Sequence, residues 1–150
     1  GNGHATTFRA LLAAFAARGH EVLFLERDVP WYAGHRDLPD PAFCRLAYYD
    51  SLAALEGWRE AIAGADAVMV GSYVPDGIAV GAFVHRHARG VTCFYDIDTP
   101  VTLAALDRGE CDYLSRALIP GFDLYFSFSG GPVLTQLEQA YGARRARALY

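Results

Sequence analysis

Residues 91–100 read VTCFYDIDTP, and this stretch decides the fold. Its first five residues are apolar, β-branched or aromatic, which is typical of a parallel strand buried on both faces. The run ends at two carboxylates, Asp96 and Asp98, and Thr99 with Pro100 then favours a helix start, because proline fits the first helical position. Open α/β sheets bind ligands outside the carboxyl ends of their strands. We therefore expect functional groups around Asp96.

Strand-like and helix-like segments alternate on both sides of this stretch. The apolar runs predict strands, and periodic apolar residues followed by glycine predict helices. This alternation predicts an α/β fold with a mainly parallel sheet and helices on both faces. Expected strands cover residues 22–25, 45–49, 67–70, 91–95, 123–128 and 148–150, and expected helices cover 5–18, 51–64, 76–90, 100–106 and 133–141.

Composition limits the possible classes of protein. The chain has 150 residues, of which 53% are hydrophobic and 20% charged, so we expect one domain. A formal charge of −4 disfavours binding to nucleic acid or to an anionic membrane. All thirteen basic residues are arginine, which excludes a Schiff-base or P-loop lysine within the chain. Three widely spaced cysteines, Cys44, Cys93 and Cys111, indicate reduced thiols and a cytoplasmic setting.

No signal-peptide pattern opens the chain, and no apolar run approaches the ~20 residues of a membrane span. The opening, Gly1-Asn2-Gly3-His4, instead resembles the loop between a strand and a helix. We expect the first strand, which lies near the middle of a doubly wound sheet, to be missing from this chain. Backbone N–H groups of Gly1, Asn2 and Gly3 could stabilise an anion at the helix start, and the alternative is a tight turn without a ligand.

Several stretches, taken in order, resemble one known family. They are similar to the amino-terminal half of bacterial glycosyltransferases related to the spore-maturation protein CgeB, which have the GT-B architecture. The likeness covers essentially the whole chain. It rests on GNGHATTFRALLAAFAARGHEVLFLERDVPWYAGHRDLPD at residues 1–40, GSYVPDG at 71–77, FYDIDTPVTL at 94–103 and SFSGGP at 127–132.

This resemblance implies an enzyme of two Rossmann-like domains that transfers a sugar from a nucleotide-sugar donor. The amino-terminal domain of such enzymes holds mainly the acceptor, and the carboxyl-terminal domain holds mainly the nucleotide sugar. Residues 1–150 would then be a single acceptor-side domain, inactive alone, with the carboxyl-terminal domain of the same protein absent from this chain. The expected partners are a nucleotide sugar as co-substrate and an acceptor small molecule or glycan, with no cofactor beyond these.

The resemblance also implies a catalytic pair. In several inverting GT-B enzymes a histidine after the first strand deprotonates the acceptor hydroxyl and a later aspartate orients it, and His4 with Asp96 or Asp98 matches that pair. Asp96 is the better candidate for the orienting carboxylate, because a helix cap would explain Asp98. Imidazole has a pKa near the working pH, and a carboxylate stabilises the imidazolium that forms. The alternative for His4 is a packing or capping role at the helix start, and for Asp98 it is a helix cap.

Asp96-Ile97-Asp98 also matches the DxD pattern that holds a divalent metal in other glycosyltransferases. Two carboxylates alone make an incomplete site for a hard cation. GT-B enzymes as a group do not use this motif, so the resemblance implies no metal site here.

Two further groups of residues are candidates for ligand binding. Tyr73 and Asp76 could line the acceptor pocket, since aromatic rings and carboxylates suit sugar faces and hydroxyls. The turn formed by Ser129, Gly130 and Gly131 could bind an anion at the start of the following helix. Both groups could equally serve only to anchor loops or turns.

A second hypothesis is a Rossmann-like module that binds NAD(P) or a nucleotide without glycosyl transfer. Glu26, at the end of the strand expected at residues 22–25, would then bind the ribose. The third glycine of the dinucleotide-binding fingerprint is replaced by Thr6, which disfavours this hypothesis.

Overall fold

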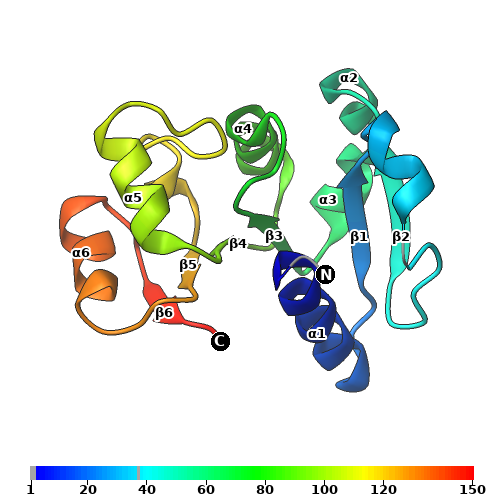
Figure 1. Cartoon of the computed structure of the whole chain (residues 1–150), viewed down its shortest axis with the longest axis horizontal. Coiled ribbons are helices and arrows are strands. Elements are labelled where there is room, and N and C mark those ends of the chain that lie inside the picture. The colour runs from blue at the N-terminus through cyan, green and yellow to red at the C-terminus, as the bar shows by residue number, and fades with distance from the viewer. Residues whose placement is uncertain (1–2, 37) are drawn as a thin grey trace. The chain divides into compact units, whose positions relative to one another are not determined.

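The computed structural model describes residues 3–36 and 38–150 (Figure 1). The chain divides into two compact units, Gly1–Ala54 and Leu55–Tyr150, and each is described here by itself. Strands pair in parallel in both units and alternate with helices, which confirms the predicted α/β fold with mainly parallel sheets. No helix in the described ranges is long and apolar enough to cross a membrane.

The first unit contains a long helix and a two-stranded parallel sheet. Strand β1 pairs with β2 from Leu23 opposite Arg45 to Arg27 opposite Tyr49. The connection between them is anchored by Arg36, whose guanidinium lies 2.6 Å from the Asp28 carboxylate. The predicted helix and both predicted strands are confirmed here. The elements are α1 (Gly3–Ala17), β1 (Leu23–Arg27), the 3-10 helix η1 (Pro30–His35) and β2 (Arg45–Tyr49), and α2 (Leu52–Leu55) spans the boundary with the second unit.

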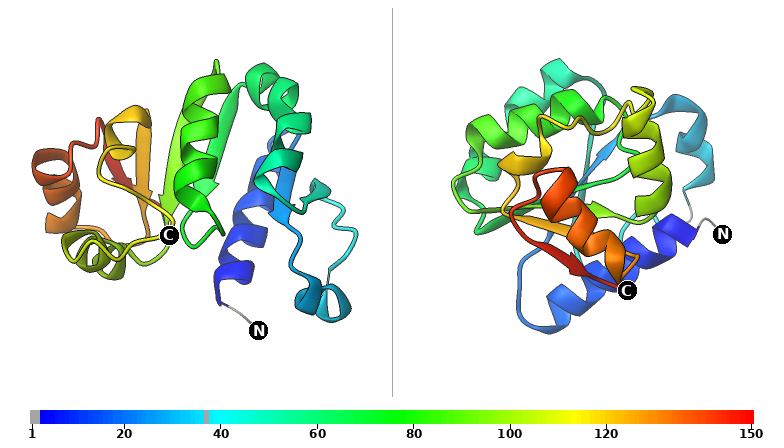
Figure 2. Two further views of the ribbon diagram at one scale, coloured as in Figure 1. Left: turned by 90° about the horizontal axis from the view of Figure 1, so that it is seen from above. Right: turned by 90° about the vertical axis from the view of Figure 1, so that its left-hand side faces the viewer.

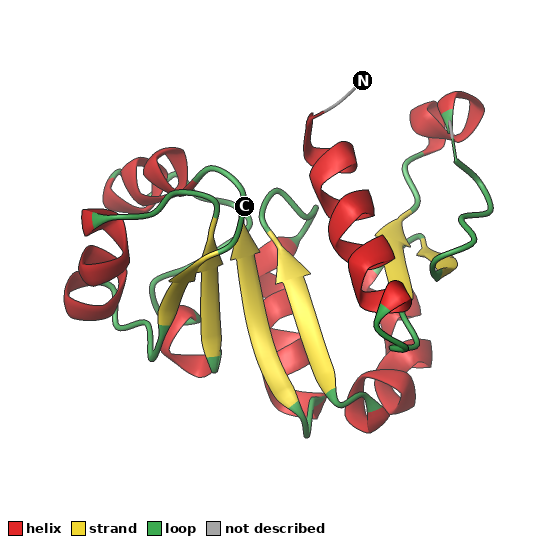
Figure 3. Ribbon diagram, turned by 90° about the horizontal axis from the view of Figure 1, so that it is seen from below, coloured by secondary structure: helices red, strands yellow, loops and turns green. Residues whose placement is uncertain are grey.

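The second unit is built on a four-stranded parallel sheet in the order β3-β4-β5-β6. The strands point in the same direction (Figure 3), and α4 packs against β3 in the connection to β4 (Figure 2). Each of the last three strands is reached through a helix, as in βαβ units. The elements are η2 (Glu56–Trp58), α3 (Arg59–Gly64), β3 (Ala67–Gly71), α4 (Gly77–His87), β4 (Val91–Asp96), α5 (Thr99–Asp107), η3 (Ile119–Gly121), β5 (Leu124–Ser127), α6 (Pro132–Ala140) and β6 (Ala146–Ala148).

Strand β4 is the core of the second unit. Every residue of β4 after Val91 is buried, so side chains are enclosed on both faces of the sheet, as the apolar run predicts. Phe94 is fully buried between the rings of Phe122 and Tyr125, with centroid separations of 5.5 and 5.2 Å. Cys93 is also buried, and burial raises the pKa of its thiol to about 11. The thiol therefore serves as a small apolar group.

Two predicted elements differ from the structure. The single helix expected at 51–64 is divided into α2, η2 and α3. Ser51 does cap this region, because the backbone N–H of Ala54 donates to its hydroxyl at 3.1 Å, but Gly57 then disfavours a continuous helix. The last strand covers Ala146–Ala148, not 148–150. It lies at the sheet edge with only Ala146 buried, so its sequence carries no clear apolar pattern.

Candidate functional site

Three loops of the second unit meet at the carboxyl ends of β3, β4 and β5. The strand registers place Gly71 beside Tyr95 and Asp96 beside Ser127, so the residues that follow these strands lie next to one another. Backbone bonds continue the pairing beyond the strands, from Ser72 N to the Tyr95 carbonyl and from Phe128 N to the Asp96 carbonyl, both at 2.9 Å. This edge is where a parallel sheet presents its ligand-binding residues.

Asp96 is fully buried at this edge, and its carboxylate is held from three sides. Oδ1 accepts hydrogen bonds from Asp98 N at 3.1 Å and from Thr102 Oγ1 at 2.9 Å. Oδ2 accepts a hydrogen bond from the Tyr125 hydroxyl at 2.6 Å. Burial raises the pKa of Asp96, and the hydrogen bonds from Tyr125 and Thr102 act in the opposite direction. The carboxylate thus ties the turn after β4 to both α5 and β5.

Hydroxyl groups extend this network away from Asp96. Thr102 Oγ1 lies 2.7 Å from the Tyr113 hydroxyl, and Thr99 Oγ1 lies 2.6 Å from Ser127 Oγ. The Ser127 hydroxyl also donates to the Ser129 carbonyl at 2.6 Å and accepts from Ser129 N at 3.0 Å. The turn that begins at Ser129 is therefore connected to the turn after β4 through buried hydroxyls.

The sequence analysis missed every side-chain partner of Asp96. Thr99 and Thr102 carried a signal that could have been used, because they are three residues apart on the helix that follows and so share one face. Tyr113 and Tyr125 carried none, since their positions depend on the register of β5 and on the course of the loop before it.

Asp98 occupies a different environment only two residues along the chain. It is half-buried at the N-cap position of α5, but its side chain makes no capping hydrogen bond. Across residues 3–36 and 38–150, no hydrogen bond or ion pair to this carboxylate is seen. Asp98 therefore occupies the N-cap position that the helix-cap alternative predicts, but its carboxylate does not bond the backbone of the helix. Asp98 is the carboxylate at this edge that retains free acceptor capacity.

Tyr73 and Asp76 lie in the loop between β3 and α4, and both have left-handed backbone conformations. Their φ angles are 64° and 55°, which cost roughly 1–3 kcal/mol each for residues other than glycine. Tyr73 is 40% exposed, and its ring centroid lies 4.6 Å from that of the buried Tyr113. Such strain is concentrated at ligand-binding and active sites.

Gly77 allows this loop to approach the segment around Tyr113. A Cβ at Gly77 would lie 2.6 Å from the Tyr113 carbonyl oxygen and 2.7 Å from its Cα. We expect Gly77→Ala to destabilise the protein by about 1–3 kcal/mol through overpacking, measured by urea unfolding. Gly57→Ala is the matched control, because a Cβ there meets no atom within 4 Å. Equal stability of the two variants would contradict this close approach.

The predicted anion site at Ser129, Gly130 and Gly131 precedes α6. Gly131 has a φ of 73°, which glycine adopts without strain. A Cβ at Gly130 would collide with the hydroxyl of Tyr150, whose ring contacts Phe128 edge-on at 5.9 Å. The turn therefore lies at the same sheet edge as Asp96 but is packed against the end of the chain.

The remaining predicted residues belong to the first unit. His4 and Gly3 lie in the first turn of α1, and both are exposed. Gly1 and Asn2 lie outside the described residues. The second unit brings Tyr73, Asp76, Asp96, Asp98 and the Ser129 turn to one sheet edge, whereas the pairing of His4 with Asp96 or Asp98 stays a prediction. Within the described ranges, no three His, Cys, Asp or Glu residues are arranged as ligands for one metal ion.

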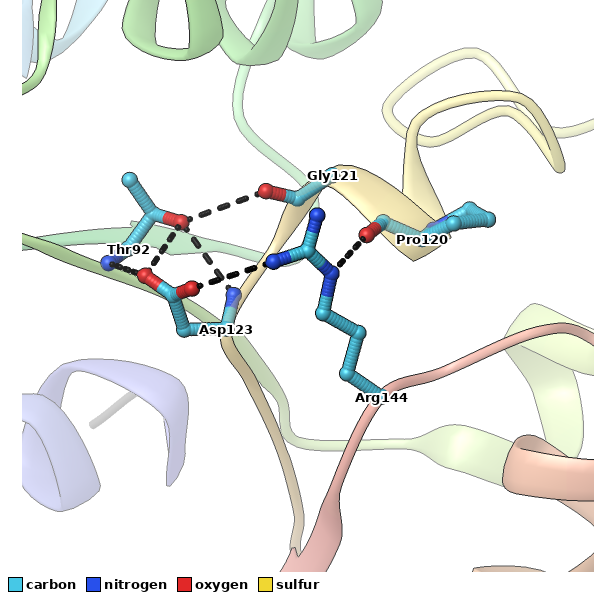
Figure 4. A network of polar contacts seen from close by, with 5 residues as sticks. All are labelled: Thr92, Pro120, Gly121, Asp123 and Arg144. Carbon is cyan, nitrogen blue, oxygen red and sulfur yellow. Dashed lines mark hydrogen bonds and ion pairs between the residues drawn. The ribbon is translucent and has the colours of Figure 1, made fainter.

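The opposite end of the sheet carries a polar network of a different kind (Figure 4). The Asp123 carboxylate accepts from Thr92 N at 2.8 Å, and Asp123 N donates to the Thr92 hydroxyl at 3.2 Å. Arg144 covers this pair, donating to the Pro120 carbonyl at 2.8 Å and approaching Asp123 at 3.5 Å. These contacts join the amino ends of β4 and β5, and they give Arg144 a structural role.

His85 of α4 lies beside this network. Its ring packs edge-on against Phe122 at 4.4 Å and against Gly121, and within the described part of the chain its Nε2 has no hydrogen-bond partner. Burial lowers the pKa of His85, the positive charge of Arg144 lowers it further, and Asp123 partly opposes both. The neutral imidazole is therefore the form that the fold accommodates.

This depressed pKa predicts how stability depends on pH. Below the ordinary histidine pKa of 6.5, the unfolded chain binds a proton that the folded chain resists, so the free energy of unfolding should fall as the pH falls through this value. His85→Leu should weaken this dependence, and His35→Leu, at an exposed position, should preserve it. Urea unfolding over a pH series would measure both. An unchanged slope in His85→Leu would contradict the assignment.

Comparisons with known proteins identify no relative. No family model, no curated protein and no solved structure matches the chain. The function must therefore be inferred from the residues of the chain itself.

Proposed function

We propose that this chain forms the acceptor-binding part of a glycosyltransferase that moves a sugar from a nucleotide-sugar donor to an acceptor hydroxyl. The observation that supports it most is that two side chains occur at the carboxyl edge of the sheet: the half-buried Asp98, whose carboxylate has no hydrogen-bond or ion-pair partner among the described residues, and the exposed Tyr73, whose backbone is strained. Carboxylates accept hydrogen bonds from sugar hydroxyls, and aromatic rings pack on the apolar faces of sugars. The sequence resemblance supports the same class of reaction.

The role proposed for each residue follows from its burial and its hydrogen bonds. His4 is the base that removes the acceptor proton, and its exposed position at the start of α1 leaves the imidazole accessible. Asp96 is fully enclosed, so it contributes by holding the turn that carries Asp98. The Ser129–Gly131 turn, at the start of α6, would stabilise negative charge on the diphosphate through backbone N–H groups.

The test is turnover by the natural full-length protein. We expect release of nucleoside diphosphate from one member of a panel of UDP- and GDP-sugars, and the release should depend on a hydroxyl acceptor. Isothermal titration with NAD provides the comparison for the alternative binding module. Tight NAD binding without turnover of any nucleotide sugar would contradict the proposal.

A further inference from the structure

Three large hydrophobic side chains are exposed at the carboxyl edge of the second unit. Tyr73 lies in the loop after β3, and Ile78 and Val101, which are 38% and 49% exposed, lie in the first turns of α4 and α5. The first turn of a surface helix is usually rich in polar and acidic residues, but neither of these two turns contains an acidic residue. We call Tyr73, Ile78 and Val101 the apolar rim.

The apolar rim is grouped around one buried residue, Tyr113. The ring centroid of Tyr73 lies 4.6 Å from that of Tyr113. The chain neighbours of the other two rim residues approach it as well: a Cβ at Gly77 would lie 2.6 Å from the Tyr113 carbonyl oxygen, and Thr102 Oγ1 lies 2.7 Å from the Tyr113 hydroxyl. Single exposed hydrophobic residues are ordinary, whereas several grouped together form a patch of the kind that marks a binding surface.

Most polar side chains at this edge are used inside the fold. Asp96, Thr99, Thr102 and Ser127 have no exposed surface, and each is hydrogen-bonded to another member of the buried network. A ligand that approaches this edge therefore meets the apolar rim and not these hydroxyls.

Asp98 is the polar side chain that stays open beside the rim. It is the N-cap residue of α5 and Val101 is the third residue of that helix, and side chains at these two positions lie next to each other. No group in the described ranges donates to the Asp98 carboxylate. This carboxylate can accept a hydrogen bond from a ligand hydroxyl, whereas its charge and that of the exposed Asp76 repel an anion.

We infer that the apolar rim selects a neutral acceptor that has an aryl or alkyl group beside the hydroxyl bound by Asp98. This inference rests on the proposed function and names its class of acceptor. Burial of the aryl or alkyl group against the rim stabilises the complex. An acceptor made of hydroxyls alone would place several of them against apolar side chains, where they lose the hydrogen bonds that they make with water.

The test compares two ligands that differ only in their apolar group. Binding of methyl and phenyl β-D-glucopyranoside to the full-length protein is measured by chemical-shift titration of the backbone amides. We expect the phenyl glucoside to bind at least about fivefold more tightly, because its ring adds apolar area that the rim covers. Phenyl phosphate, which has the ring but a negative charge in place of the hydroxyls, should bind more weakly than the phenyl glucoside.

Three results would overturn the inference. One is equal affinity for the two glucosides, and another is tightest binding of phenyl phosphate. The third is the absence of shifts at residues 73–78 and 98–101 with either glucoside, which is the result expected if the carboxyl-terminal domain covers the rim.

Two valine substitutions separate the rim from effects on the whole fold. Val101→Ala removes apolar area from the rim and should weaken binding of the phenyl glucoside by about three- to tenfold, with less than about a twofold change for the methyl glucoside. Val91→Ala is the matched control, because Val91 is 44% exposed at the opposite end of β4. An equal effect of the two substitutions, or no effect of Val101→Ala, would contradict the role of the rim.

Asp98→Asn tests the end of the ligand that carries the hydroxyls. A neutral amide is a weaker acceptor than a carboxylate, so both glucosides should lose affinity by the same factor, about three- to tenfold, and the preference for the phenyl glucoside should remain. Unchanged affinity for both glucosides, with native circular dichroism, would exclude Asp98 from the site and overturn the inference.

These measurements use no nucleotide sugar, so they are independent of turnover. Preferential binding of the phenyl glucoside without transfer from any donor would refute the proposed function and leave the rim as a binding surface. Transfer to methyl and phenyl glucosides with equal KM would support the proposed function and overturn the inference.

Discussion

Asp96→Ala is expected to destabilise the protein by about 2–6 kcal/mol, a large part of the 5–15 kcal/mol that stabilises a typical domain. The substitution leaves two buried donors without their acceptor, the Tyr125 hydroxyl and the backbone N–H of Asp98, while the Thr102 hydroxyl keeps the Asp98 carbonyl at 3.2 Å. Each buried donor that loses its partner costs about 1–3 kcal/mol. Urea unfolding followed by tyrosine fluorescence would measure the loss.

Asp98→Ala provides the matched control. The two carboxylates are two residues apart, but the side chain of Asp98 makes no hydrogen bond or ion pair with any of the residues the structure describes. Its removal should change the free energy of unfolding by less than about 1 kcal/mol. Equal destabilisation by the two substitutions would contradict the assignment of Asp96 as the anchor of this edge.

His4→Ala is expected to lower the rate of sugar transfer by about 10²–10⁴-fold, the usual contribution of a general base. The residue is exposed in the first turn of α1, so the thermal midpoint should change little. The assay is nucleoside diphosphate release by the natural full-length protein at saturating donor.

His35→Ala, at another exposed histidine of the first unit, should retain normal turnover. Turnover near the unsubstituted level in His4→Ala would exclude this histidine as the base. Loss of turnover together with a lowered thermal midpoint would assign it a structural role instead.

The sequence predicts the central part of the fold well, and the reason is physical. The residues from Val91 to Tyr95 are apolar, β-branched or aromatic, and a strand covered on both faces accounts for the burial of all of them after Val91. Prolines and glycines then mark the helix boundaries, as Pro100 does for α5 and Pro132 for α6. The two elements that differ from the prediction lie where this apolar pattern is weak. They are the divided helix at 52–64 and the edge strand β6, which begins before its expected position.

The environment of each carboxylate is what sequence reasoning could not supply. Position alone predicts that Asp96 and Asp98 lie at a functional edge, and it predicts a helix cap at Asp98. The structure places Asp98 at that cap with a φ of −146° and no capping bond, while Asp96 Oδ1 accepts from the Asp98 N–H. Tyr125 reaches Asp96 only through strand pairing, and Tyr113 reaches Thr102, the other side-chain donor to Asp96, only through the path of a loop.

The central claim is that ligands bind where β3, β4 and β5 end in the second unit. Its most direct test is chemical-shift mapping of the backbone amides in the full-length protein as methyl β-D-glucopyranoside is added. The account predicts that the largest changes fall on the loops carrying Tyr73, Asp98 and Ser129. Changes confined to the opposite end of the sheet, around Thr92, Asp123 and Arg144, would contradict it.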